Sequence, residues 1–106
     1  MMHFNIKNFD RGWIIGNFDN SVLKTEDFEL GIKNYKSGEF NPNHFHKLSK
    51  EINFIVSGVV KFNEKYFSAG DVVVVEENEC SFFECIEDCC IVVARNKSIS
   101  TDKYEC

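Results

Sequence analysis

The amino-acid sequence predicts an all-β fold, built as a sandwich or closed barrel of short strands. Runs that alternate between apolar and polar residues, rich in β-branched and aromatic side chains, are separated by Gly, Asn, Asp and Ser. No stretch shows sustained helical periodicity. A chain of 106 residues is long enough for one domain and too short for two, so we expect residues 1–106 to form a single domain.

Nine segments have the composition or alternation of strands. They are 12–18, 28–35, 44–48, 51–57, 59–63, 66–67, 72–75, 81–85 and 89–95. Turn residues lie between them, at 36–38, 63–64 and 69–71. Many short strands with short connections in one small chain favour a closed barrel or a two-sheet sandwich.

Two segments predict which faces of the sheets are covered. In 28–35, apolar residues (Phe28, Leu30 and Ile32) alternate with a wetter set (Glu29, Gly31 and Lys33), which predicts one buried face and one wetter face. Segment 72–75 and much of 52–56 are apolar on both faces. A lone barrel leaves one face of such strands in water, so this pattern predicts a symmetric homodimer.

The charge pattern excludes some classes of partner. The net charge is −5, from 17 acidic and 12 basic residues, and the basic residues are scattered. Nucleic-acid binding requires clustered cations, so we expect none. The apolar run 72–75 is far shorter than the ~20 residues of a membrane helix. The first residues do not resemble a signal peptide, and a cytoplasmic location is expected.

Five cysteines are present, and four of them fall between Cys80 and Cys90. Secreted disulfide frameworks normally use an even number of cysteines. In the expected compartment, free thiols are favoured.

His44, His46 and Glu51 are candidate metal ligands. On a strand, residues two apart leave the same face about 6–7 Å apart, from which two imidazoles can converge on one ion. A turn after His46 would place Glu51 on the neighbouring strand, within reach of the same point. The pattern alone leaves two alternatives open: a chance His-x-His pair, and a solvated Glu51 at a hairpin.

The whole segment resembles the first conserved motif of the cupin superfamily. The motif reads Gly38, His44, His46, Glu51 and Gly58 in this sequence, five fixed positions over 21 residues with every gap of allowed length. The chain is thus similar to a short single-domain cupin. The resemblance implies an antiparallel double-stranded β-helix, or jelly-roll barrel. It also implies that His44, His46 and Glu51 hold a divalent metal ion: Fe, Mn, Ni, Co or Zn.

The second cupin motif begins at Gly70 and then departs from the family pattern. Four expected residues (Pro, Gly, His and Asn) are replaced, by Glu76, Asn78, Ser81 and Cys85 respectively. The family's fourth protein ligand is therefore missing. Water could fill its place, or nothing; the protein alternatives, in order, are a cysteine (Cys80 or Cys85) and His3.

The resemblance implies a metal-binding small cupin that binds a small polar metabolite of the sugar or keto-acid type. The fold hosts both enzymes and non-catalytic proteins, so the sequence leaves open whether this chain is an enzyme. Two alternatives remain: a non-catalytic ligand-binding or sensing module, and a metal-free dimeric barrel.

Overall fold

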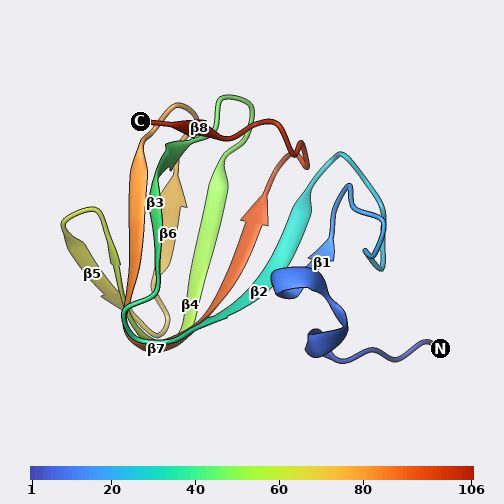
Figure 1. Cartoon of the computed structure of the whole chain (residues 1–106), viewed down its shortest axis with the longest axis horizontal. Helices are drawn as coiled ribbons and strands as arrows, with labels where there is room; N and C mark the ends of the chain where they lie inside the picture. The colour runs from blue at the N-terminus through green and yellow to red at the C-terminus, as the bar shows by residue number, and fades with distance from the viewer.

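The computed structural model describes residues 1–106 as eight strands and two short 3-10 turns, with no α-helix (Figure 1). No helix is long and apolar enough to cross a membrane. The elements are η1 (Ile6–Asn8), η2 (Asp10–Gly12), β1 (Trp13–Ile15), β2 (Glu29–Tyr35), β3 (Phe40–Phe45), β4 (Glu51–Phe62), β5 (Lys65–Ser68), β6 (Val72–Val75), β7 (Ser81–Arg95) and β8 (Tyr104–Glu105).

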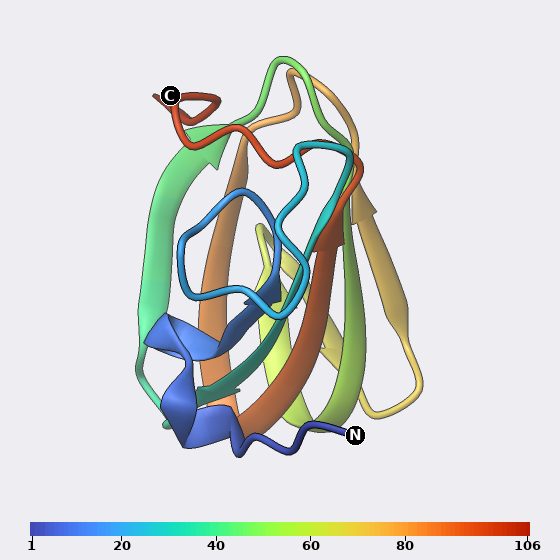
Figure 2. The ribbon, with the colours of Figure 1, turned by 90° about the vertical axis from the view of Figure 1, so that its right-hand side faces the viewer.

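Two long strands, β4 and β7, form the spine of the fold and pair antiparallel along most of their length. On the other edge of β7, β2 pairs with the second half and β3 with the first. On the other edge of β4, β6 pairs with the first half and β5 with the second. The strands thus form two facing layers, β1-β2-β7-β4-β6 and β8-β3-β7-β4-β5, that share β4 and β7 (Figures 1 and 2). This confirms the predicted antiparallel double-stranded β-helix.

A bulge at Gly58 lets β4 pass from one layer to the other. The β4–β7 register shifts on both sides of this residue, whose φ is +85°. A Cβ there would lie 2.3 Å from the carbonyl oxygen of Asp88, so only glycine fits. The prediction of separate strands at 51–57 and 59–63 was therefore wrong, because a bulge bends a strand without ending it. In the same way, 81–85 and 89–95 form one strand.

Other strand boundaries also differ from the prediction. The strand expected at 44–48 is β3, which begins at Phe40 and ends at Phe45. It ends there because the next residues turn toward β4 and bond to the C-terminal segment. The first strand is shorter than expected, and η1, η2 and β8 were not predicted.

The core lies between the two layers. Its buried side chains are Ile55, Val60, Phe62, Phe83, Cys85, Cys89, Ile91 and Val93. At one end the interior becomes polar, where Glu29 is 4% exposed and accepts hydrogen bonds from Arg95 at 3.2 Å and Ser98 at 2.9 Å. Phe28 is 38% exposed. The face of segment 28–35 that carries Glu29 therefore points into the barrel, although its polarity predicted the solvent side. It can do so because Arg95 and Ser98 donate hydrogen bonds to the Glu29 carboxylate.

The N-terminal turns lie against β2 (Figure 1). Gly12 allows this close approach, since a Cβ there would lie 1.9 Å from the carbonyl oxygen of Ile32. Trp13 then packs its indole directly over Gly31. The chain is thereby fixed beside one wall of the barrel.

Candidate metal centre

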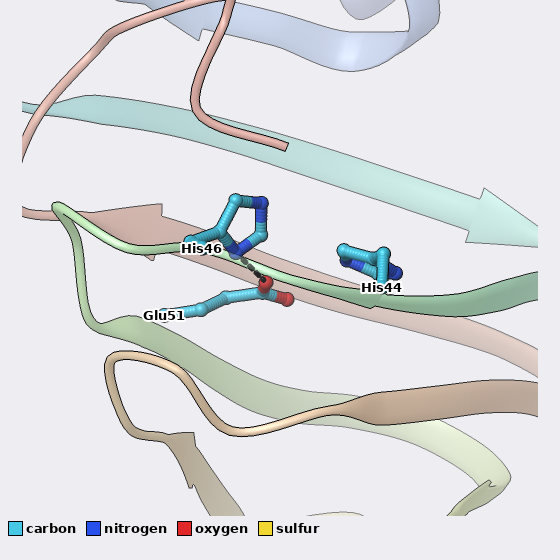
Figure 3. Close-up of side chains that lie close together, drawn as sticks. All are labelled: His44, His46 and Glu51. Carbon is cyan, nitrogen blue, oxygen red and sulfur yellow. Dashed lines mark ion pairs between the residues drawn. The ribbon is translucent and has the colours of Figure 1, made fainter. Parts of the chain in front are cut away.

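Three side chains converge at one end of the barrel (Figure 3). His44 lies near the end of β3, His46 follows that strand, and Glu51 is the first residue of β4. One potential ligand atom from each residue lies within 4.8 Å of the others. The structure thus brings together all three residues singled out in the sequence. Glu51 is not solvated, since its side chain is 15% exposed.

His44 is held in the tautomer that a metal ligand needs. Its Nδ1 lies 2.9 Å from the carbonyl oxygen of Pro42. A carbonyl oxygen only accepts, so Nδ1 carries a proton, and in the neutral ring the lone pair is then on Nε2. A backbone carbonyl on the second ring nitrogen is the usual way in which proteins orient a metal-binding histidine.

His46 is the most buried of the three, at 6% exposed. Burial, followed by the positive charge of Arg95 and the neighbouring His44, lowers the pKa of His46 to about 4. The imidazole is therefore neutral at pH 7. Its Nδ1 lies 3.7 Å from Oε2 of Glu51, which is a contact with a neutral ring and not an ion pair. A neutral imidazole beside a carboxylate suits a divalent ion.

Asp102 fixes the loop between His46 and Glu51. Its carboxylate is 1% exposed and accepts hydrogen bonds from the backbone N–H of Lys47 at 2.8 Å and of Leu48 at 3.1 Å. It also accepts one from the Ser49 hydroxyl at 3.2 Å and lies 3.4 Å from the Arg95 guanidinium. A residue near the C-terminus therefore orients the loop between two of the three candidate ligands.

The environment of Asp102 keeps it ionised. Burial by itself raises the pKa of this carboxyl, but the hydrogen bonds from Lys47, Leu48 and Ser49 and the charge of Arg95 together bring it below its ordinary value. Nothing in the local sequence distinguishes Asp102 from a surface residue. Its partners in the loop, Lys47, Leu48 and Ser49, are more than fifty residues away in the chain, so the sequence offered no signal for it.

The loop from β6 to β7 also lies beside the cluster. Ser81 stands opposite His44 in the β3–β7 register and is 5% exposed, so it occupies the place of the family's fourth ligand with a short hydroxyl. Asn78 replaces the motif's Gly and has φ +66°, a left-handed conformation that Asn tolerates. Its N–H donates to the carbonyl of His46 at 2.7 Å. The turn is preserved although the ligand is lost.

None of the protein alternatives for a fourth ligand joins the cluster. Cys80 forms a disulfide with Cys106, which corrects the expectation of free thiols: β8 returns along β3 and brings the C-terminal residue beside Cys80. Cys85 is fully buried in the core, and His3 lies in the exposed N-terminal segment. The remaining alternatives are water or no ligand.

The other three cysteines are free. Burial, together with a hydrogen bond that the Cys89 thiol makes to Cys85, raises the pKa of Cys89 to about 12. This thiol is therefore protonated and unreactive. Cys85 and Cys89 belong to the core cluster and act there as small apolar side chains.

The three candidate ligands line a cavity of about 800 Å³ inside the barrel. Its other walls include polar side chains (Asn41, Asn53, Tyr35 and Lys33) and apolar ones (Trp13, Phe62, Phe83 and Val93). The size lies within the range of small-molecule sites. Only ten of its 27 lining residues are hydrophobic, so polar and charged groups make up most of the lining.

Solved structures share this architecture. An uncharacterized protein with a double-stranded β-helix domain from Klebsiella pneumoniae is 16% identical, with a TM-score of 0.68 over 91% of this chain and 84% of that one. An RmlC-like cupin from Shewanella frigidimarina is 15% identical, with a TM-score of 0.67 over 72% of this chain and 71% of that one. This chain has the cupin fold.

A longer structure also matches, the DMSP lyase DddQ from Ruegeria pomeroyi, at 16% identity and a TM-score of 0.72. The match covers 88% of this chain and 49% of that one, so this chain spans about half the length of the lyase. No family model matches the sequence, and no curated protein sequence does. The similarity to cupins is thus detected by comparing three-dimensional structures, at low sequence identity.

Proposed function

We propose that this cupin binds one divalent metal ion through His44, His46 and Glu51, and holds a small polar metabolite of the sugar or keto-acid type beside it. The proposal is supported chiefly by the convergence of three potential ligand atoms within 4.8 Å at the wall of the cavity. A divalent ion there would polarise an oxygen of the bound molecule. Two imidazoles and a carboxylate suit Fe, Mn, Ni, Co or Zn.

Metal analysis of the purified protein tests this assignment. We expect about one equivalent of a divalent metal per chain in protein purified without chelator, and a loss of that metal in the double variant His44→Ala and His46→Ala. His3→Ala is the matched control, because it removes the third histidine, which lies outside the cluster. Retention of the metal by the double variant, with the fold intact by circular dichroism, would reject the site.

A catalytic role is the first form of this proposal. With three protein ligands, an ion keeps open positions for water or substrate, as catalytic ions do. The similar DMSP lyase is an enzyme, whereas the protein from Klebsiella pneumoniae is described as uncharacterized. The alternative, a binding or sensing module without turnover, is favoured by the replacement of the motif's second-hairpin histidine by Ser81.

We also propose that the protein is a homodimer through the outer face of the layer that contains β6, β4, β7 and β2. Two apolar rows cross these strands in register: Val74, Ile52, Ala94 and Leu30, and Val72, Phe54, Val92 and Ile32. Four of these side chains are 41–58% exposed: Ile52, Phe54, Val72 and Val74. A second copy would cover them by face-to-face packing at about 10 Å.

Light scattering after size exclusion tests the dimer. Phe54→Lys lies at the centre of the apolar rows and is expected to give a monomer with the fold retained. Tyr66→Lys is the control, because Tyr66 is 62% exposed on β5, outside these rows. A monomeric wild-type protein at high micromolar concentration would refute the proposed interface.

A cytoplasmic location completes the proposal. Three of the five cysteines are free thiols, which is usual where the compartment is reducing. In that compartment the Cys80–Cys106 bond would be open for most molecules. Maleimide labelling during lysis is expected to modify Cys80 and Cys106; full protection of both would instead indicate an oxidising location.

A further inference from the structure

The charge inside the cavity differs in sign from the charge of the chain. The protein has a net charge of −5. The cavity, however, is lined by five basic side chains (Lys7, Arg11, Lys33, Arg95 and Lys103) and three acidic ones (Asp10, Glu39 and Glu51). A divalent ion at the candidate metal centre would add two further positive charges. The cavity therefore favours an anionic occupant.

Lys33 is the cavity cation whose charge is least compensated. Arg95 is paired with Glu29 and Asp102, and Arg11 lies 3.8 Å from Asp10. No carboxylate lies within 4.0 Å of Lys33 Nζ, which donates to the carbonyl of Arg11 at 2.6 Å and lies 3.8 Å from the centre of the Trp13 ring. Lys7 and Lys103 are exposed and solvated. Lys33 is partly buried, so water compensates its charge less well.

Lys33 shares the inner face of the barrel with the candidate ligands. In the register of β2, β7 and β4 it aligns with Ile91 and Ile55, both fully buried, while Glu51 aligns with Arg95 and Glu29. Two strand spacings and four residues thus separate the backbones of Lys33 and Glu51, which is about 10 Å across and about 13 Å along the sheet. Their long side chains shorten that gap. An occupant that touches both ends must be elongated.

Neutral polar groups line the same cavity. Asn53 is 2% exposed and follows Glu51 by two residues on the same face of β4. Tyr35 follows Lys33 by two residues, and its hydroxyl accepts a hydrogen bond from Asn41 at 3.3 Å. These groups can bond hydroxyl or carbonyl oxygens along the body of an elongated molecule.

We propose that the cavity binds an elongated acid, whose one end meets the metal and whose far end carries an anionic group that pairs with Lys33. The inference rests on the proposed metal site and specifies the class of metabolite that it serves. Lys33 is then the residue that selects for the second negative charge. Burial and the charge of Arg11 lower the pKa of Lys33 to about 8, so the ammonium form still predominates at pH 7.

Two matched probes test the proposal by calorimetry on Zn²⁺-loaded protein. 2-Hydroxyglutarate and 2-hydroxypentanoate have the same metal-binding end, and only the first has a distal carboxylate. We expect wild-type protein to bind 2-hydroxyglutarate about tenfold or more tightly than 2-hydroxypentanoate, as a charge-assisted hydrogen bond in a partly buried site allows. Lys33→Met should abolish this preference while leaving Zn²⁺ stoichiometry unchanged.

Controls separate the role of Lys33 from general effects of charge and folding. Lys61→Met removes another lysine that lies over an aromatic ring, Tyr66 at 5.4 Å, but does not line the cavity; it should retain the preference. Lys33→Arg should retain part of it. Equal binding of both probes by wild type, no binding of either, or a preference that survives in Lys33→Met overturns the proposal while the metal site stands. Failure to bind Zn²⁺ at all would instead remove the proposed function.

Discussion

The β3–β4 and β6–β7 connections both lie beside the candidate metal centre, yet they differ in what they keep of the cupin pattern. The first supplies His44, His46 and Glu51 in convergent positions. The second keeps its turn, through Asn78 with φ +66°, but presents the short Ser81 where the family has histidine. The turn between β6 and β7 is therefore kept although the metal ligand that follows it in the family is lost.

One of the two largest expected effects follows from breaking the support of the loop between His46 and Glu51. Asp102→Asn removes a buried negative charge that accepts hydrogen bonds from residues 47–49 and pairs with Arg95. We expect a loss of about 3 kcal/mol in unfolding free energy at pH 7, because one partner of a buried ion pair is removed. Urea denaturation measures it, and Asp71→Asn, at an exposed turn, is the control.

The pH dependence of the same variant gives a second measurement. Because the folded-state pKa of Asp102 lies below its ordinary value, its contribution is present above that ordinary value and is lost as the pH falls through the folded-state pKa. The stability gap between wild type and Asp102→Asn should therefore be full at pH 7 and shrink below about pH 4. A gap that is constant down to pH 2 would contradict the assigned role.

Removing the Cys80–Cys106 disulfide should destabilise the part of the barrel that contains the β6–β7 connection and Ser81. Cys80 precedes Ser81, and Cys106 ends the segment whose β8 pairs with His44 and Phe45. Cys80→Ser with Cys106→Ser is expected to destabilise the fold by about 3 kcal/mol, the typical value for a loop of this size. Added dithiothreitol should lower the melting temperature of wild type and leave that of the variant unchanged. An equal response of both would point to the other cysteines.

The comparison can also be sharpened by restoring the missing ligand. Ser81→His places an imidazole on the inner face opposite His44, beside a cavity with room for it. We expect Zn²⁺ affinity to rise on the order of a hundredfold, or about 2.7 kcal/mol. Competition with a chromophoric chelator measures this change. Unchanged affinity would mean that a side chain at position 81, after the β6–β7 loop, does not reach the ion.

The parts of this site that the sequence predicted are those encoded over short distances. His44, His46 and Glu51 fall within eight residues, so the strand period and the short loop between β3 and β4 keep them close together. Asp102 and the Cys80–Cys106 bond were missed because their partners meet only once β8 has returned along β3. The inner face of β2 was assigned to solvent, because polarity along one strand cannot show that Glu29 finds Arg95 on another.

Strands β4 and β7, shared by both layers, determine how this chain must fold. The pairs Glu29↔Arg95 and Glu51↔Arg95 join residues far apart in sequence, so long segments must close before β7 has two neighbours. Chains dominated by such distant pairings fold in milliseconds to seconds. Because β3 and β4 each pair with β7 and not with each other, His44, His46 and Glu51 converge only once β7 is in place, so a ribosome-bound chain that lacks β7 would not yet hold the two imidazoles and the carboxylate together for a cellular metal.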